Sequence, residues 1–218
     1  MHTNMWVVDN VVERKKYYPQ LQEAAKLLRE NEAVAFPTET VYGLGANAMN
    51  DEAIAKIFEA KGRPSDNPLI VHIGTKSQLD GIVKEIPPVA EKLMEHFWPG
   101  PLTIILPRKE GISEKVTAGL HTVGVRMPDH PVALALIEEA NVPVAAPSAN
   151  RSGRPSPTLA SHVYEDLNEK IAGIVDGGAT GVGVESTVID CTSTVPTILR
   201  PGGITKEQLE AVIGTVSL

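Results

Sequence analysis

The chain has 218 residues, of which 42% are hydrophobic and only 4% aromatic, so it can bury a sizeable core of mainly aliphatic side chains. Its 20 Lys and Arg against 27 Asp and Glu give a formal net charge of −7, which argues against a dedicated nucleic-acid-binding protein because phosphate contacts dominate such binding. The single cysteine, Cys191, excludes an intrachain disulfide framework, and no apolar run approaches the length of a membrane span. We therefore expect a cytoplasmic protein with no membrane partner, in which Cys191 packs as a small apolar side chain.

Hydrophobic periodicity divides the chain into alternating segments. In chain order, the first half predicts a helix over 19–31, a strand over 33–36, a turn over 37–45, a helix over 50–61 capped by Asn50, a strand over 69–73, a helix over 88–97 and a strand over 102–106. The second half predicts a strand over 123–126, a helix over 131–140, a strand over 142–146, a helix over 158–167 capped by Thr158, strands over 174–176, 186–190 and 197–199, and a last helix opened by a capping box of Thr205 and Gln208. This order predicts one α/β domain with a mixed sheet.

The stretch from Ala60 to His72 concentrates two cations, an amide and an imidazole between a predicted helix and a predicted strand. Gly62, Pro64 and Pro68 interrupt regular structure, so we expect Lys61 and Arg63 to lie on a shaped loop. Arginine offers a planar fork to phosphate or carboxylate, and lysine offers a point charge. The alternative is a surface loop with two solvated cations.

Several common catalytic sites are excluded by the residues present. One cysteine and scattered histidines do not form a zinc site, Ser148 has no nucleophile elbow around it, and the glycine run at 177–183 lacks the ending of a P-loop. What remains is a set of polar loops next to apolar strands, at 38–42, 61–72, 148–156 and 183–187. Ligand sites of α/β sheets gather at strand ends, so we expect these loops to converge and to bind anionic substrates by charge.

Eight motifs in order resemble the YrdC family of threonylcarbamoyl-AMP synthases. They are Pro37-Thr38-Glu39-Thr40-Val41-Tyr42-Gly43-Leu44, Lys61-Gly62-Arg63, Asn67-Pro68-Leu69, Trp98-Pro99-Gly100-Pro101-Leu102-Thr103, Gly124-Val125-Arg126-Met127-Pro128, Ala146-Pro147-Ser148-Ala149-Asn150, Ser186-Thr187-Val188-Ile189-Asp190 and Arg200-Pro201-Gly202. Each motif alone is weak, whereas all eight together are specific. The resemblance covers about residues 17–213, which divides the chain into an N-terminal extension at 1–16, a YrdC-like catalytic domain at 17–213 and a tail at 214–218.

The resemblance implies a twisted mixed sheet flanked by helices, with a concave electropositive site. It implies a nucleotidyltransferase that condenses L-threonine, bicarbonate or CO2, and ATP into threonylcarbamoyl-AMP and pyrophosphate, with Mg2+ carried by the ATP and no metal ligand identified in the protein. The product serves threonylcarbamoyladenosine modification of tRNA through a separate transferase and its partner proteins, with at most a weak contact to tRNA. Some relatives continue into a second C-terminal domain, so this chain resembles either a short form or a truncated long one.

The resemblance also assigns residues to roles. The L-threonine pocket is assigned to Thr40, His72, Arg126 and Ser186. The ATP side is assigned to Lys61, Arg63, Asn67, Thr122, Ala146, Ser148, Asn150, Ser156 and Arg200, and the catalytic set is Lys61, Arg63, Ser148 and Asn150. We expect Lys61 and Arg63 to hold phosphates and Lys61→Ala to reduce product formation with little loss of folding.

Structural roles stand as alternatives to these assignments. Apart from the surrounding motifs, His72 is better explained by a satisfied strand histidine. The Thr40 and Ser186 hydroxyls are explained by bonds to the backbone, Ser148 and Asn150 by a capped turn, and Arg200 by a salt bridge.

Two rival functions remain open at this stage. One is an RNA-binding module that uses the concave face without catalysis, which the acidic net charge and sparse aromatics disfavour. The other is a carbamoyl-transfer relative that takes carbamoyl phosphate.

Overall fold

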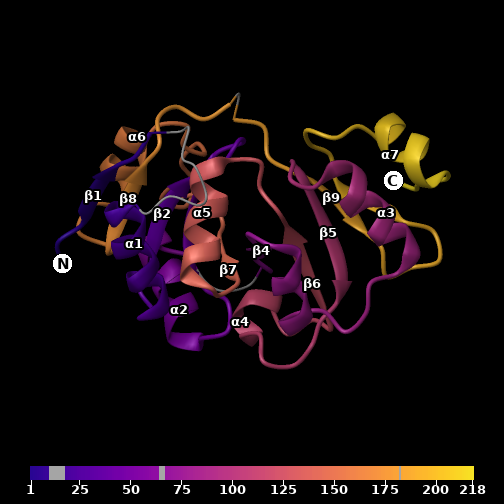
Figure 1. Ribbon diagram of the computed structural model, residues 1–218, viewed down its shortest axis with the longest axis horizontal. Coiled ribbons are helices and arrows are strands. Elements are labelled where there is room, and N and C mark those ends of the chain that lie inside the picture. The colour runs from indigo at the N-terminus through magenta and orange to yellow at the C-terminus, as the bar shows by residue number, and fades with distance from the viewer. Residues whose placement is uncertain (10–17, 64–66, 182) are drawn as a thin grey trace.

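The computed structural model describes residues 1–9, 18–63, 67–181 and 183–218. Its described strands form one sheet in the order β1-β8-β2-β3-β7-β4-β6-β5-β9-β10, which runs across the molecule in Figure 1. The strands are β1 (Asn4–Val7), β2 (Val34–Pro37), β3 (Tyr42–Asn47), β4 (Ile70–His72), β5 (Leu102–Pro107), β6 (Thr122–Arg126), β7 (Val144–Ala145), β8 (Gly173–Asp176), β9 (Thr187–Asp190) and β10 (Thr197–Arg200).

The sheet is mixed, as the sequence predicts. Parallel pairs join β1 with β8, β2 with β8, β4 with β6 and β5 with β9, while the other neighbouring pairs are antiparallel. In the parallel pair of β4 and β6, His72 lies opposite Arg126. The register therefore places side chains from residues 54 positions apart next to each other, at the ends of two central strands.

Helices flank the sheet. They are α1 (Pro19–Arg29), α2 (Asp51–Lys61), α3 (Pro88–Phe97), α4 (Glu114–Thr117), α5 (Pro131–Ala140), α6 (Ala160–Leu167) and α7 (Lys206–Ile213), with a 3-10 helix η1 at Lys76–Gly81. Helices α1 and α5 pack against each other at one end of the sheet, and α3 and α7 pack together at the other end (Figure 1). The predicted α/β architecture with flanking helices is therefore confirmed.

Local sequence signals explain several helix ends. The Asn50 side chain accepts a hydrogen bond from Ala53 N at 2.8 Å and caps α2, and Thr205 and Gln208 form the predicted capping box of α7. The predicted cap of α6 is wrong, because its N-cap residue is Leu159 and no side chain caps it. Gly62 ends α2 with φ of 69°, a left-handed conformation that favours glycine because it has no Cβ.

Four described elements differ from the sequence predictions. The expected turn over 37–45 already contains β3 from Tyr42 onward, because hydrogen bonding to β2 extends its second half into a strand. Strand β1 lies within the expected N-terminal extension and pairs with β8. Helix α4 and η1 are short and carry no periodic apolar pattern long enough to predict them.

The core consists mostly of aliphatic side chains, as the composition predicts. Its largest cluster includes Leu44, Ile57, Val125 and the thiol-bearing Cys191, and a second cluster holds the alternate strand residues Val34, Phe36 and Val144. Cys191 is 3% exposed, directly after β9, which confirms its apolar packing role. No helix among the described residues has the length and apolar character needed to span a membrane.

Candidate active site

The four polar loops converge as predicted. Together with the ends of β6 and β10, they line a pocket of about 260 Å³. The lining residues are Thr38, Thr40, Val41, Gly43, Arg63, Asn67, Pro68, Leu69, Ile70, His72, Arg126, Ala146, Pro147, Ser148, Glu185, Ser186 and Arg200. All four residues assigned to L-threonine are in this set, although they come from four separate segments of the chain.

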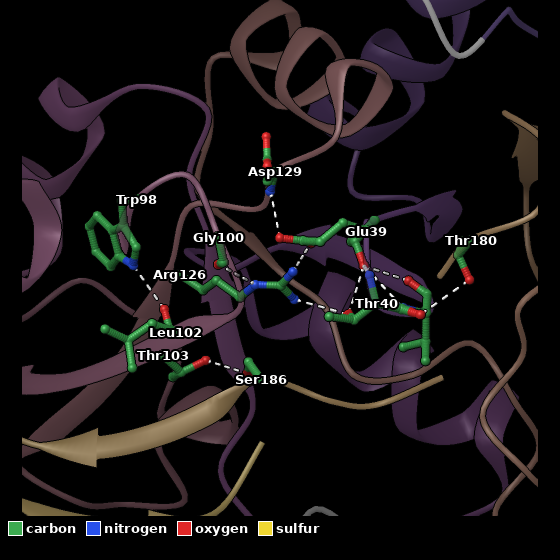
Figure 2. A network of polar contacts seen from close by, with 12 residues as sticks. Glu39, Thr40, Trp98, Gly100, Leu102, Thr103, Arg126, Asp129, Thr180 and Ser186 are labelled. Carbon is green, nitrogen blue, oxygen red and sulfur yellow. Dashed lines mark hydrogen bonds and ion pairs between the residues drawn. The ribbon is translucent and has the colours of Figure 1, made fainter. Parts of the chain in front are cut away.

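Arg126 is the most enclosed cation of the pocket. Its Nε donates to the Gly100 carbonyl at 3.1 Å, its Nη1 donates to Thr40 Oγ1 at 3.3 Å, and its Nη2 forms an ion pair with Glu39. Figure 2 shows the guanidinium held between these three partners. Burial lowers the pKa of Arg126, and Glu39 opposes this shift. A buried charge is costly unless it is paired and hydrogen-bonded, and the three partners of Arg126 meet this need. They also fix the plane of the guanidinium.

The Thr38–Tyr42 turn explains why Thr40 faces Arg126. Thr38 Oγ1 donates to the Val41 carbonyl at 2.7 Å and accepts from Thr40 N at 3.1 Å. It also lies 2.9 Å from Thr40 Oγ1. Hydrogen bonds from a threonine side chain to the backbone here replace the hydrogen bonds between strands of a β-sheet. The resulting turn places Thr40 among the residues that line the pocket.

His72 is neutral at physiological pH. Burial and the neighbouring Arg126 lower the pKa of His72 to about 3. Its Nδ1 lies 3.2 Å from the Ile70 carbonyl oxygen, and the Val144 backbone is a further hydrogen-bond partner of the ring. A neutral imidazole donates from one ring nitrogen and accepts at the other, so it cannot supply positive charge to an anion.

Ser186 and Arg200 form a second network. Arg200 Nε and Nη2 donate to the Ser186 carbonyl at 3.0 and 2.7 Å, and Nη2 also donates to Ser186 Oγ at 3.0 Å. Arg200 Nη1 pairs with Glu185 at 3.1 Å, and Ser186 Oγ lies 2.8 Å from Thr103 Oγ1. The salt bridge considered as the alternative role of Arg200 is therefore present. It does not remove the residue from the pocket, which Arg200 still lines.

Arg63 differs from the other two arginines of the pocket because its side chain has no acceptor among the described residues. Its buried Nε makes no hydrogen bond, and no ion pair joins Arg63 to the described residues. Its Cζ instead lies over the Phe58 ring, 5.4 Å from the ring centroid. Gly62 and Arg63 both donate their N–H groups to the Phe58 carbonyl, so the turn at Gly62 carries Arg63 back over the ring. A buried donor without a partner is costly, which points to an anionic ligand.

Lys61 is placed differently from the prediction. It is the last residue of α2 rather than part of a loop, it is 2% exposed, and it does not line the pocket. Its Nζ donates to the carbonyls of Ser148 and Asn150 at 2.5 and 2.8 Å. Asn150 likewise turns away from the pocket and donates to the carbonyls of Arg151 and Arg154 at 3.0 and 2.8 Å. Both residues support the turn that presents Ser148.

The remaining assigned residues fall into three places. Asn67, Ala146 and Ser148 line the first pocket, and Thr122 lines a second, more apolar pocket of about 400 Å³. The two pockets share Pro68, Leu69, Ile70 and Arg200, so they adjoin each other. Ser156 lines neither pocket.

Sequence reasoning missed three side chains that organise the site, Glu39, Phe58 and Thr103. Glu39 lies in the motif at 37–44, between Thr38 and Thr40. A carboxylate between two hydroxyl residues beside a buried strand is a signal for a polar site, from which Glu39 could have been predicted. Phe58 gives no signal in the sequence, because nothing local indicates that Arg63 folds back onto its ring. Thr103 was hidden in an apolar strand, where a single hydroxyl is a weak signal.

The described residues do not form a dedicated metal site. No group of three or more His, Cys, Asp or Glu side chains among them could hold a metal ion. Among the described residues that line the first pocket Glu185 is the only carboxylate, and it already pairs with Arg200, while Asp190 lines the second pocket. Magnesium needs oxygen ligands and is commonly held by substrate phosphates with few protein carboxylates.

Comparison with known proteins gives consistent matches over nearly the whole chain. The family model Sua5_yciO_yrdC, described as telomere recombination, matches residues 26–202. A threonylcarbamoyl-AMP synthase of Bacillus subtilis is 64% identical over 217 residues, covering 99% of this chain and 63% of the relative. One from Pyrococcus abyssi is 56% identical over 214 residues, covering 98% of this chain and 63% of the relative.

A solved structure agrees with these matches. The crystal structure of P. abyssi Sua5 complexed with L-threonine matches with a TM-score of 0.93 at 54% identity, covering 99% of this chain and 62% of that one. This chain thus spans less than two thirds of the length of these relatives.

Proposed function

Because this chain belongs to the Sua5/YciO/YrdC family, we propose that it is a threonylcarbamoyl-AMP synthase, a nucleotidyltransferase that uses L-threonine, bicarbonate or CO2, and ATP. The observation that supports this most is the contrast within one pocket between the enclosed Arg126 and the unpartnered Arg63. One end of the pocket suits a small carboxylate, and the other end suits a phosphate.

The amino-acid end contains Arg126, Thr40, His72 and Ser186. The Arg126 guanidinium pairs with the carboxylate of L-threonine, and the neutral His72 and the Thr40 and Ser186 hydroxyls offer acceptors and donors to its hydroxyl and amino groups. The L-threonine complex of P. abyssi Sua5, with which this fold superposes closely, supports the choice of amino acid.

The nucleotide end extends from Arg63 into the second pocket. Arg63, Asn67 and Ser148 face the triphosphate, and Arg200 lies at the junction of the two pockets. The second pocket is lined by Leu120, Ile105 and Thr122 and takes the adenosine group. Lys61 and Asn150 act at this end by holding the Ser148 turn in place, rather than by contacting phosphate.

Magnesium would be carried by ATP, whose phosphate oxygens would be its ligands. The ion would offset part of the negative charge of these phosphates. Glu185 is the side chain of the pocket that could add a ligand, at the cost of its pairing with Arg200.

The reaction requires the protein to position the substrates and to offset the negative charge of the phosphates. It requires no covalent nucleophile from the protein. The amine of L-threonine combines with CO2 to give N-carboxythreonine and a proton. A carbamate oxygen then attacks the α-phosphorus of ATP, a P–O bond forms, and the bond to pyrophosphate breaks. Arg126 orients the amino acid, and Arg63 offsets negative charge on the phosphates as the leaving group separates. The product then serves a separate tRNA transferase, and this chain needs at most a weak contact with tRNA.

Pyrophosphate release tests this proposal. We expect release from ATP only when L-threonine and bicarbonate are both present, and a loss of at least about tenfold in Arg63→Gln. The matched control Arg29→Gln removes an exposed arginine at the end of α1 and should leave the rate unchanged. Release that does not depend on L-threonine, or salt-sensitive tRNA binding without any ATP turnover, would contradict the proposal and favour a binding module.

A further inference from the structure

The carboxylate of Glu39 sets Arg126 apart from Arg63. Glu39 lies behind Arg126, outside the residues that line the pocket, and pairs with Nη2 of its guanidinium. Arg126 and Glu39 together carry no net formal charge, whereas Arg63 keeps a full positive charge with no described partner. The two ends of one pocket therefore differ by one unit of charge, although each presents a guanidinium.

Glu39 is fixed by contacts on both its side chain and its backbone. Its second carboxylate oxygen accepts a hydrogen bond from Asp129 N at 2.8 Å, just before α5. Its main-chain carbonyl accepts from Gly181 N at 3.2 Å. Figure 2 shows the side chain extended between Arg126 and Asp129. The Glu39 side chain is 23% exposed and that of Arg126 is 5% exposed, so the pair is weakly screened by solvent.

A fixed carboxylate behind an arginine discriminates between anions. An amino-acid carboxylate carries one negative charge, and inorganic phosphate or a terminal phosphate group carries between one and two at neutral pH. Repulsion from Glu39 grows with the charge of the ligand, and placing like charges together is a common means of rejecting a wrong ligand.

We propose that Glu39 is a specificity-determining residue that reserves the Arg126 end for a monoanionic carboxylate and directs phosphate groups toward Arg63. This inference rests on the proposed function in assigning the amino acid to Arg126. It adds that Glu39 prevents phosphate groups from occupying the amino-acid site.

Calorimetric titration tests the proposal without turnover. Inorganic phosphate is titrated into the wild-type protein and into Glu39→Gln, alone and in competition with L-threonine. We expect phosphate to compete with L-threonine at least about tenfold more strongly in Glu39→Gln. The control Glu32→Gln removes the carboxylate of the Lys56 ion pair, away from both pockets, and should behave as wild type. Equal competition by phosphate in Glu39→Gln and wild type would overturn the proposal.

Two further variants separate charge from structure. Glu39→Asp keeps the charge and should keep phosphate excluded, so it remains informative if Glu39→Gln folds poorly. The double variant Glu39→Gln with Arg126→Gln should lose the new phosphate site, and retention of that site would place it elsewhere and contradict the proposal. If L-threonine binds but no adenylate forms, the proposed function fails while the role of Glu39 stands.

Discussion

The Nζ atom of Lys61 lies 2.8 Å from the main-chain carbonyl oxygen of Asn150, so a buried cation joins the end of α2 to the turn at 148–150. The Ser152 N–H returns a bond to the Lys61 carbonyl at 2.9 Å. This connection gives the lysine of the Lys61-Gly62-Arg63 motif a structural role beside the ligand-facing role of Arg63. It also changes the expectation that Lys61 can be removed with little loss of folding.

Replacing Lys61 by Met should lower the free energy of unfolding by about 1–3 kcal/mol, because the buried Asn150 carbonyl and the partly buried Ser148 carbonyl lose their donor. Urea denaturation measures this change. The control Lys26→Met removes an exposed lysine, which is 71% accessible and pairs with Glu30, and should change stability by less than about 0.5 kcal/mol. Equal stability of the two variants would show that the Lys61 bonds contribute nothing.

The same lysine predicts a pH dependence of stability. Burial and the neighbouring Arg63 lower the pKa of Lys61 from 10.5 to about 8. Between these values the unfolded chain holds a proton that the folded chain has released, so the contribution of Lys61 to the free energy of unfolding rises as pH increases. The wild type should therefore gain stability relative to Lys61→Met by on the order of 2 kcal/mol between pH 8 and pH 10.5. A difference that stays constant over this range would contradict the shift.

The ring of Phe58 predicts a selective effect on the nucleotide. Phe58→Leu keeps an apolar side chain in the core but removes the aromatic face beneath Arg63, an interaction of about 0.5–2 kcal/mol. We expect the KM for ATP to rise by about two- to thirtyfold while the KM for L-threonine stays unchanged. Phe97→Leu, at the end of α3 and outside both pockets, is the matched control. Equal effects on both substrates would indicate a general packing defect.

The geometry of Arg126 predicts the opposite selectivity. Lysine retains the positive charge but cannot donate at once to Gly100, Thr40 and Glu39 and still pair with a ligand. In Arg126→Lys, the affinity for L-threonine should fall by at least about tenfold while that for ATP changes little. Calorimetric titration of each ligand separates the two effects, and an unchanged affinity for L-threonine would remove Arg126 from the amino-acid end.

Much of this arrangement is predictable from the sequence because it depends on local pattern. Apolar periodicity predicts most helices and strands, and the four polar loops predict a shared site since each borders a strand that must be buried. The orientation of individual side chains is not predictable in this way. Glu39 and Arg126 are 87 residues apart, as are Lys61 and Ser148, so their pairing depends on strand order and register. The sequence therefore predicts which cations belong to the site. It does not predict that Glu39 neutralises Arg126 and that Arg63 has no such partner among the described residues.

The most direct test of the central claim is the mass of the product formed from ATP, L-threonine and bicarbonate labelled with carbon-13. The proposed reaction predicts threonylcarbamoyl-AMP that contains the labelled carbon in its carbamoyl group, formed together with pyrophosphate. A threonine adenylate without the label, or AMP and ADP alone from folded protein with magnesium present, would contradict the assignment of this pocket as a threonylcarbamoyl-AMP synthase site.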